Sequence, residues 1–282
     1  MEQLLLSGIT IGATYALAAL AYTLTYSVIG TINFAQGQVY MVGGFAAWWA
    51  SSHFHWGISL LIAAGVGAAL NVLVELIGFR PLKRAPLLSV FITGLGLAMV
   101  IQGVMFNWVG PKTYVLPELG EGWTIGPLIV SQSAVVILVI MVGLASLTSW
   151  VLARTGAGWS LRAVSSDRDA AEIIGMPTRG IITTTFAAAG ALSGIAGGLV
   201  AYYFNAINVS VGLTAGIIAF TAAIIGGIGS VPGTVLGGLL IGLSQVGATA
   251  YISSALRDAI VFAILLVFLI VKPSGFFGRE MH

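Results

Sequence analysis

Residues 154–179, RTGAGWSLRAVSSDRDAAEIIGMPTR, determine how this chain is organised. They interrupt an otherwise almost continuously apolar sequence. Seven of the twenty Lys, Arg, Asp and Glu residues lie in this stretch. Over the whole chain charged residues make up 7%, against about 25% in ordinary globular proteins. The sequence therefore predicts a set of membrane-spanning runs and one polar loop that stands outside the membrane.

The polar loop contains the signals of a short helix over residues 166–174. Ser166 followed by Asp169 is an S-x-x-D start signal, in which the serine oxygen accepts from a backbone amide. Gly175 is suited to the left-handed cap conformation, and Pro177 prevents continuation. A helix of about two turns is unstable alone in water. We therefore expect it to dock on a soluble partner, through Ser166, Asp167, Arg168, Asp169, Ala170, Ala171, Glu172, Ile173, Ile174 and Gly175.

The rest of the chain has the composition of an integral membrane protein. Hydrophobic residues make up 58% of the 282 residues, and the mean hydropathy is +1.04. At about 20 residues for each span, plus loops, this length accommodates eight or nine hydrophobic helical segments. We expect an all-α polytopic membrane protein, formed by a single transmembrane domain over residues 1–282 with a cytoplasmic loop at 154–180.

Two glycine patterns add detail to this picture. Gly190, Gly194 and Gly198 recur on one face of the run 181–204, a spacing that lets helices pack closely in a membrane. The apolar runs 214–225 and 234–248 flank the break GGIGSVPG at 226–233. Because both runs are short, we expect broken or re-entrant helices around 214–250, which membranes tolerate only where protein or a cavity surrounds them.

Polar but uncharged residues stand beside the expected breaks in the helices. They have two interpretations, which the sequence leaves open: they line a permeation path, or they satisfy the backbone groups that broken helices expose. These residues are Asn33, Gln36, Gln38, Asn205, Asn208 and Ser230.

The cations predict an orientation by the positive-inside rule. With residues 79–86, 154–180 and the C-terminal tail on the cytoplasmic side, nine of the eleven Lys and Arg residues lie inside, and only Lys112 and Arg257 lie outside. Counting back through three spans puts the N-terminus outside. The reverse orientation would leave those nine cations on the wrong face.

No constellation of an enzyme appears in the sequence. It contains no P-loop motif G-x-x-x-x-G-K-[ST], no metalloprotease motif H-E-x-x-H and no G-x-S-x-G. Glu75 lies near the end of a span and is expected to pair locally, and His53 and His55 lack further ligands for a metal. We expect no catalytic residue, no metal site and no cofactor bound by this chain.

Several motifs resemble one transporter family. They are TYAL at 14–17, YSVIG at 26–30, NFAQG at 33–37, GWSLRA at 158–163 and, most specific, AFTAAIIGGIGSVPG at 219–233. With these motifs the chain is similar, over essentially its whole length, to the smaller type of permease subunit of branched-chain amino acid ABC importers. One departure is Gln36, where many relatives are expected to carry histidine.

The resemblance implies an inner-membrane permease that works with a second, related permease. It further implies two cytoplasmic ATPase subunits, which use ATP, and a periplasmic binding protein that delivers branched-chain amino acids. The segment 166–174 would then be the coupling helix that inserts into the ATPase. Relatives with this architecture that import urea, short amides or other small solutes remain an alternative, and so does a channel or facilitator without an ATPase.

Overall fold

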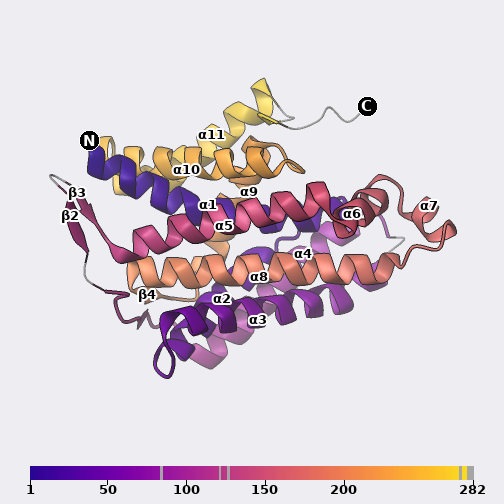
Figure 1. Ribbon diagram of the computed structural model, residues 1–282, viewed down its shortest axis with the longest axis horizontal. Coiled ribbons are helices and arrows are strands. Elements are labelled where there is room, and N and C mark those ends of the chain that lie inside the picture. The colour runs from indigo at the N-terminus through magenta and orange to yellow at the C-terminus, as the bar shows by residue number, and fades with distance from the viewer. Residues whose placement is uncertain (83–84, 121, 126–127, 273–274, 278–282) are drawn as a thin grey trace.

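The computed structural model is an elongated bundle of helices, and it describes residues 1–282 except 83–84, 121, 126–127, 273–274 and 278–282 (Figure 1). Within these ranges six helices are long and apolar enough to cross a membrane. They are α1 (Glu2–Ile29), α3 (Trp56–Val74) with the turns η1 (Glu75–Phe79) and η2 (Arg80–Leu82), α4 (Leu87–Val109), α5 (Gln132–Arg154), α8 (Thr178–Phe204) and α10 (Val231–Tyr251).

Three further apolar helices are shorter. They are α2 (Gln36–Ser51), α9 (Val211–Gly226) and α11 (Arg257–Val271), with 16, 16 and 15 residues. The all-α polytopic fold is therefore confirmed, with six helices of spanning length and these three shorter ones in the described part of the chain. The expected break after residue 226 is also present. However, α10 has 21 residues and is long enough to span, so only α9 of this pair is short.

The polar stretch 154–179 folds as two helices, α6 (Gly156–Ser166) and α7 (Arg168–Ile173). At the opposite end of the bundle, beside the N-terminus, lie four short strands (Figure 1). These are β1 (Tyr114–Val115), β2 (Trp123–Ile125), β3 (Leu128–Val130) and β4 (Ala206–Ile207). A short helical turn, η3 (Ser254–Leu256), precedes α11. Strand β1 pairs antiparallel with β4, and β2 with β3. We call these two ends the α7 end and the N-terminal end.

Helix α8 lies at the centre of the bundle, against α1, α2 and α3. Its glycines allow backbones to approach closely. A Cβ atom at Gly190 would overlap the carbonyl oxygen of Gly67, and one at Gly194 would overlap that of Ala63. A Cβ atom at Gly198 would come within 2.8 Å of the side chain of Leu60. The glycine face of α8 is thus buried against α3 and not exposed to lipid.

Close backbone contact at α8 predicts the effect of a large side chain there. Gly194→Leu should destabilise the folded chain by about 1–3 kcal/mol or more, because the added carbons overfill a packed interface. Gly65→Leu is the matched control, since a Cβ atom at Gly65 on the exposed face of α3 meets nothing within 4 Å. Thermal unfolding in detergent and abundance in the membrane measure the difference. Equal stability of the two variants would contradict this packing.

Candidate functional site

Helix α7 is capped at both ends. The carboxylate of Asp167 accepts a hydrogen bond from the amide of Ala170 at 2.9 Å, which satisfies one of the free amides of the first turn. Gly175 takes the left-handed conformation at φ 84°, and the amide of Met176 donates to the carbonyl of Ala171 at 3.0 Å. The hydrogen bond from Met176 to Ala171 and the left-handed Gly175 together form the glycine-terminated helix end that the sequence predicted.

The structure corrects the start of this helix. Ser166 is the last residue of α6, and the N-cap of α7 is Asp167. The reason is that a preceding helix, α6, includes Ser166, and the amide of Asp167 still donates to the carbonyl of Ala163. Helix α6 itself was missed. Its signal was Thr155, whose hydroxyl caps the amide of Gly158, together with the buried pair Leu161 and Val164.

Helix α7 projects from its end of the bundle (Figure 1), and two apolar side chains near its C-terminal end are exposed. Ile173 and Ile174 are 85% and 75% exposed, whereas Ala171 is buried. The base of the helix is fixed to α8, because the hydroxyl of Thr178 donates to Oε1 of Glu172 at 2.7 Å. Arg168 also approaches Glu172, with Nε 3.8 Å from Oε1. The arrangement is a protrusion that is capped at both ends, hydrogen-bonded at its base and apolar at its tip.

Two of the predicted path residues belong to a buried polar cluster inside the bundle. The Nε2 atom of Gln36 donates to the hydroxyl of Ser193 at 2.6 Å and to the carbonyl of Ala189 at 3.2 Å. Oδ1 of Asn33 accepts from the amide of Ala35 at 3.0 Å. Asn33 and Gln36 are each 1% exposed. These contacts favour the structural interpretation for both residues, which hold the start of α2 against α8.

Asn71 extends this cluster to α3. Its Nδ2 atom donates to the carbonyl of Phe186 at 2.7 Å, and its Oδ1 atom accepts from Asn33 at 3.5 Å. One helical turn away, Glu75 forms an ion pair with Arg80 at 3.1 Å and accepts from the hydroxyl of Thr183. Glu75 thus pairs locally, as its position in the sequence indicated.

The other predicted path residues lie elsewhere. Gln38 is 1% exposed and its Oε1 atom has no partner among the described residues. Asn205 ends α8 in the left-handed conformation, and Asn208 accepts from the amide of Ser210 at the N-terminal end. Ser230 caps α10 through the amide of Gly233. The six residues therefore do not form one site.

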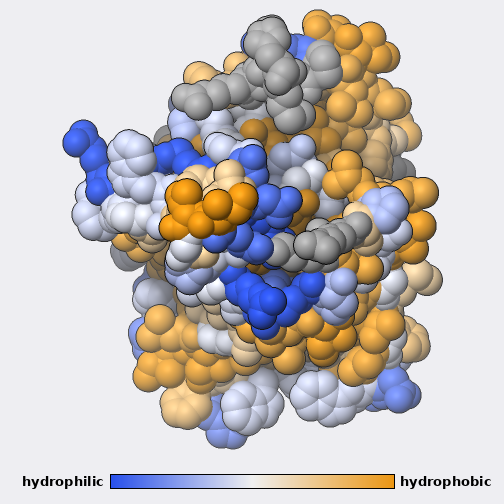
Figure 2. Space-filling model, turned by 90° about the vertical axis from the view of Figure 1, so that its right-hand side faces the viewer, coloured by the Kyte–Doolittle hydropathy of each residue, from blue (hydrophilic) through white to orange (hydrophobic). Residues whose placement is uncertain are grey.

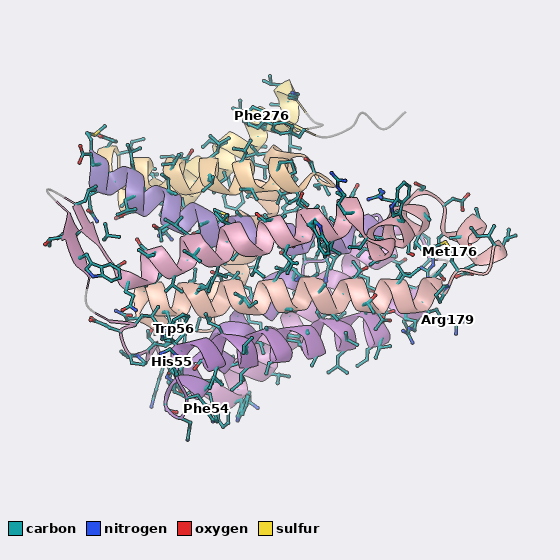
Figure 3. The ribbon with its side chains drawn as sticks, in the orientation of Figure 1. Phe54, His55, Trp56, Met176, Arg179 and Phe276 are labelled. Atoms are coloured by element: carbon teal, nitrogen blue, oxygen red, sulfur yellow. The ribbon has the colours of Figure 1, made fainter. Side chains whose placement is uncertain are left out.

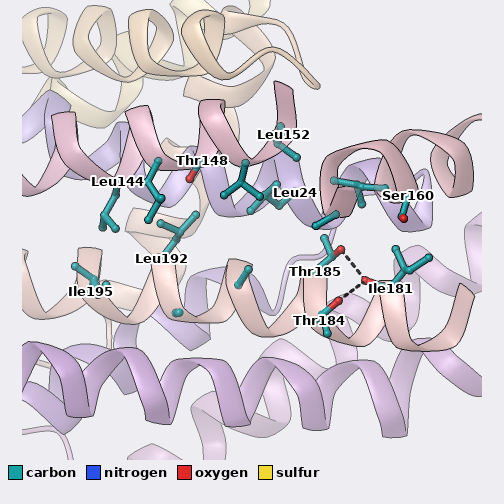
Figure 4. Close-up of a pocket in the computed structure, with 16 residues that line it drawn as sticks. Leu24, Leu144, Thr148, Leu152, Ser160, Ile181, Thr184, Thr185, Leu192 and Ile195 are labelled. Atoms are coloured by element: carbon teal, nitrogen blue, oxygen red, sulfur yellow. Dashed lines mark hydrogen bonds between the residues drawn. The ribbon is translucent and has the colours of Figure 1, made fainter. Parts of the chain in front are cut away.

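The bundle also holds an apolar pocket of about 450 Å³ between α5, α6 and α8 (Figure 4). The hydroxyls of Thr184 and Thr185, which line it, both donate to the carbonyl of Ile181. Thr148 and Ser160 add two further hydroxyls to a lining that is otherwise aliphatic. Near the N-terminal end, His55 accepts from the amide of Gly57 as the cap of α3, and no group of three or more potential metal ligands occurs among the described residues.

Comparison with known proteins gives consistent matches over nearly the whole chain. Residues 4–269 match the family model of the branched-chain amino acid transport system permease component. The high-affinity branched-chain amino acid transport system permease LivH of Escherichia coli K12 is 34% identical over 98% of this chain and 95% of its own length. The corresponding permease BraD of Pseudomonas aeruginosa is 32% identical over the same shares of the two chains.

One solved structure resembles the fold. An inward-facing metal-chelate type ABC transporter aligns with a TM-score of 0.50 over 94% of this chain and 85% of its own, at 16% identity. At this identity the likeness concerns the fold alone.

The buried cluster predicts unequal effects for two glutamines that are equally buried on α2. Gln36→Leu should destabilise the chain by roughly 1–3 kcal/mol, because it leaves Ser193 and Ala189 without their partner. Gln38→Leu should cost much less, since Oε1 of Gln38 has no hydrogen bond to lose. Thermal unfolding of the two variants in detergent measures the difference. A larger loss for Gln38→Leu would show that the cluster does not anchor α2.

Proposed function

We propose a function for this chain on the basis of its family. The chain belongs to the branched-chain amino acid transport permeases. It is a multi-pass membrane protein and a permease subunit of an ABC importer. On this premise we propose branched-chain, hydrophobic amino acids as its substrates. LivH and BraD, to which this chain is similar, are both named as permeases for branched-chain amino acids, which supports this choice. Import of urea, short amides or another small solute by the same architecture is the alternative that a transport assay would distinguish.

The observation that carries the proposed mechanism is the apolar tip of α7. Ile173 and Ile174 are exposed at the end of a helix that is capped and hydrogen-bonded to α8. Two adjacent exposed isoleucines outside the apolar flanks of the bundle are unfavourable in water, so a partner that covers them gains free energy. We propose that α7 is the coupling helix and that this partner is a cytoplasmic ATPase subunit. Its rigid base on α8 would then transmit movement into the bundle.

The remaining partners follow from the same proposal. An ABC importer requires ATP hydrolysis, and we assign ATP binding to two ATPase subunits and not to this chain. We further propose a second, related permease and a periplasmic binding protein that delivers the substrate. A channel that works without an ATPase would leave the capped, apolar tip of α7 without a role.

We propose an orientation with the α7 end in the cytoplasm and the N-terminus outside. Hydrophilic side chains gather on the α7 end, with apolar side chains around them (Figure 2). Met176 and Arg179 lie at this end, whereas Phe54, His55 and Trp56 lie at the other (Figure 3). Basic residues facing the cytoplasm and aromatic residues at an interface are both typical of membrane proteins.

The orientation is tested by labelling single cysteines, since the chain has no native one. Ser166→Cys should react with a membrane-impermeant reagent only from the cytoplasmic side, and Glu118→Cys only from outside. Both positions are exposed, and they lie in α6 and in the loop after β1. Inside-out and right-side-out vesicles provide the comparison. Labelling of both cysteines in the same vesicle type would overturn the orientation.

The coupling role of α7 is tested with two substitutions in the assembled transporter. Gly175→Val should abolish uptake and substrate-stimulated ATP hydrolysis together, because a β-branched residue strongly disfavours the positive φ of the cap. Ile174→Asp should do the same by placing a charge in the apolar contact. Both variants should leave the membrane bundle folded, since neither residue belongs to its core.

Each variant has a matched control. Gly180→Val occupies a nearby helical glycine with open surroundings and no positive φ, so it should retain activity. Ile174→Leu keeps the apolar contact and should also remain active. Uptake and ATPase activity in proteoliposomes are the readouts. Near-normal activity of both Gly175→Val and Ile174→Asp would end the coupling-helix proposal.

A further inference from the structure

A cavity of about 320 Å³ lies at the N-terminal end of the bundle, far from α7. It is enclosed by residues of α1, α2, α8, β4, α9 and α11. Its volume falls at the lower end of the range of sites for small molecules. The described contacts of the buried cluster at Gln36 do not include its lining residues, so the cavity is a separate place in the fold.

One part of the cavity wall is aliphatic. Ile11 of α1, Val200 of α8 and Ile218 of α9 line it, together with Val211 and Ala215. Such a surface accommodates a small branched hydrocarbon group, because burying apolar area stabilises a complex by about 25 cal/mol for each Å². The aliphatic wall alone would bind any small apolar group and does not define a ligand.

A second part of the wall is formed by two tyrosines, Tyr15 and Tyr40. Tyr40 is 2% exposed, and its hydroxyl forms no hydrogen bond with any residue that the structure describes. By contrast, the neighbouring lining residue Tyr15 donates to Oε1 of Gln245 at 2.9 Å. Buried polar groups are normally paired, since an unpaired one costs free energy. The hydroxyl oxygen of Tyr40 is itself inaccessible, so it does not define the ligand.

Two positive features belong to the cavity wall. Arg257, at the start of α11, lines the cavity, and its Nε atom contacts Oδ1 of Asp258 at 3.3 Å. Asp258 is not among the lining residues, so the guanidinium is the charged group of the cavity wall. The 16-residue helix α9 also begins here, and its N-cap Ser210 makes no side-chain cap. An uncapped helix N-terminus and an arginine both favour an anionic ligand.

We propose that this cavity is an outer subsite that receives the substrate and recognises its carboxylate. Arg257 and the N-terminus of α9 bind the carboxylate, and the aliphatic wall takes the branched side chain. The subsite rests on the proposed function, since it takes a branched-chain amino acid as the substrate. The proposal adds that Arg257 is the group by which this chain itself distinguishes an amino acid from a neutral solute of similar size.

The test measures the charge of the cavity and its occupancy with one introduced cysteine. Thr214→Cys lies in the cavity wall on the first turn of α9, is partly exposed and changes the side-chain volume little. The purified transporter in detergent is labelled with two methanethiosulfonates, one carrying a sulfonate and one a trimethylammonium group. The comparison of the two labelling rates and the protection by a ligand both proceed without ATP hydrolysis and without a particular orientation in the membrane.

The anionic reagent should react about tenfold faster than the cationic one, relative to their rates with a free thiol, because a nearby guanidinium attracts one and repels the other. Arg257→Gln should abolish this preference, and Arg257→Lys should retain it. L-leucine should slow the labelling, whereas leucinol, which lacks the carboxylate, should not. Tyr40→Phe removes only an inaccessible hydroxyl, so it should leave both the charge preference and the protection by leucine unchanged.

Each contrary result bears on a definite part of the proposal. Equal rates of the two reagents, or a preference that survives Arg257→Gln, would overturn the carboxylate subsite. Equal protection by leucine and leucinol would overturn it as well. An anion preference without any protection by leucine would instead contradict the amino acid substrate, and with it the proposed function. If Thr214→Cys does not react, Asn208→Cys in the wall of the same cavity is used instead. If neither cysteine is labelled, the cavity is not an open subsite and the proposal is refuted.

Discussion

The close approach of α8 to α3 and α2 is the contact on which the rest of the structure depends. In a membrane the hydrophobic effect does not drive helices together, so association relies on packing and on hydrogen bonds between helices. Gly190 and Gly194 allow backbone contact with Gly67 and Ala63. This contact brings Ser193 and the carbonyl of Ala189 within reach of Gln36, which fixes the start of the short helix α2. The short helix α2 is thus held inside the bundle by the acceptors that α8 offers to the side chain of its first residue, Gln36.

The same helix connects the interior of the membrane to the protruding helix α7. Thr178, the first residue of α8, holds Glu172 of α7, and Gly175 ends α7 in the left-handed conformation just before it. The isoleucines at the tip are therefore joined to α8 by a short connection and by the hydrogen bond between Thr178 and Glu172. At its other end α8 borders the cavity that contains Tyr40 and Arg257, through Val200 and Phe204. We infer that α8 links ATPase docking at one end with substrate reception at the other.

Local signals in the sequence predicted much of this structure, and contacts between distant residues account for what was missed. The glycine face of α8, the break after Gly226 and the cap at Gly175 depend on neighbouring residues and were predicted correctly. Helix α6 was missed because its apolar residues, Leu161 and Val164, lie within a polar stretch. The strand pair β1 and β4 joins Tyr114 to Ile207, and no local pattern indicates that pairing. For the same reason the sequence pointed to single polar residues but could not assemble the cavity, whose wall combines Tyr40 and Arg257.

The central claim is that α7 is the contact through which an ATPase drives this permease. Its most direct test is a photoreactive amino acid at Ile174 in the intact transporter, with the cross-linked partner identified by mass spectrometry. The same residue at Ile270, which is 81% exposed on the apolar helix α11, is the control. We predict that position 174 cross-links to the ATPase subunit and position 270 does not. An intact complex in which position 174 gives no ATPase adduct would contradict the account.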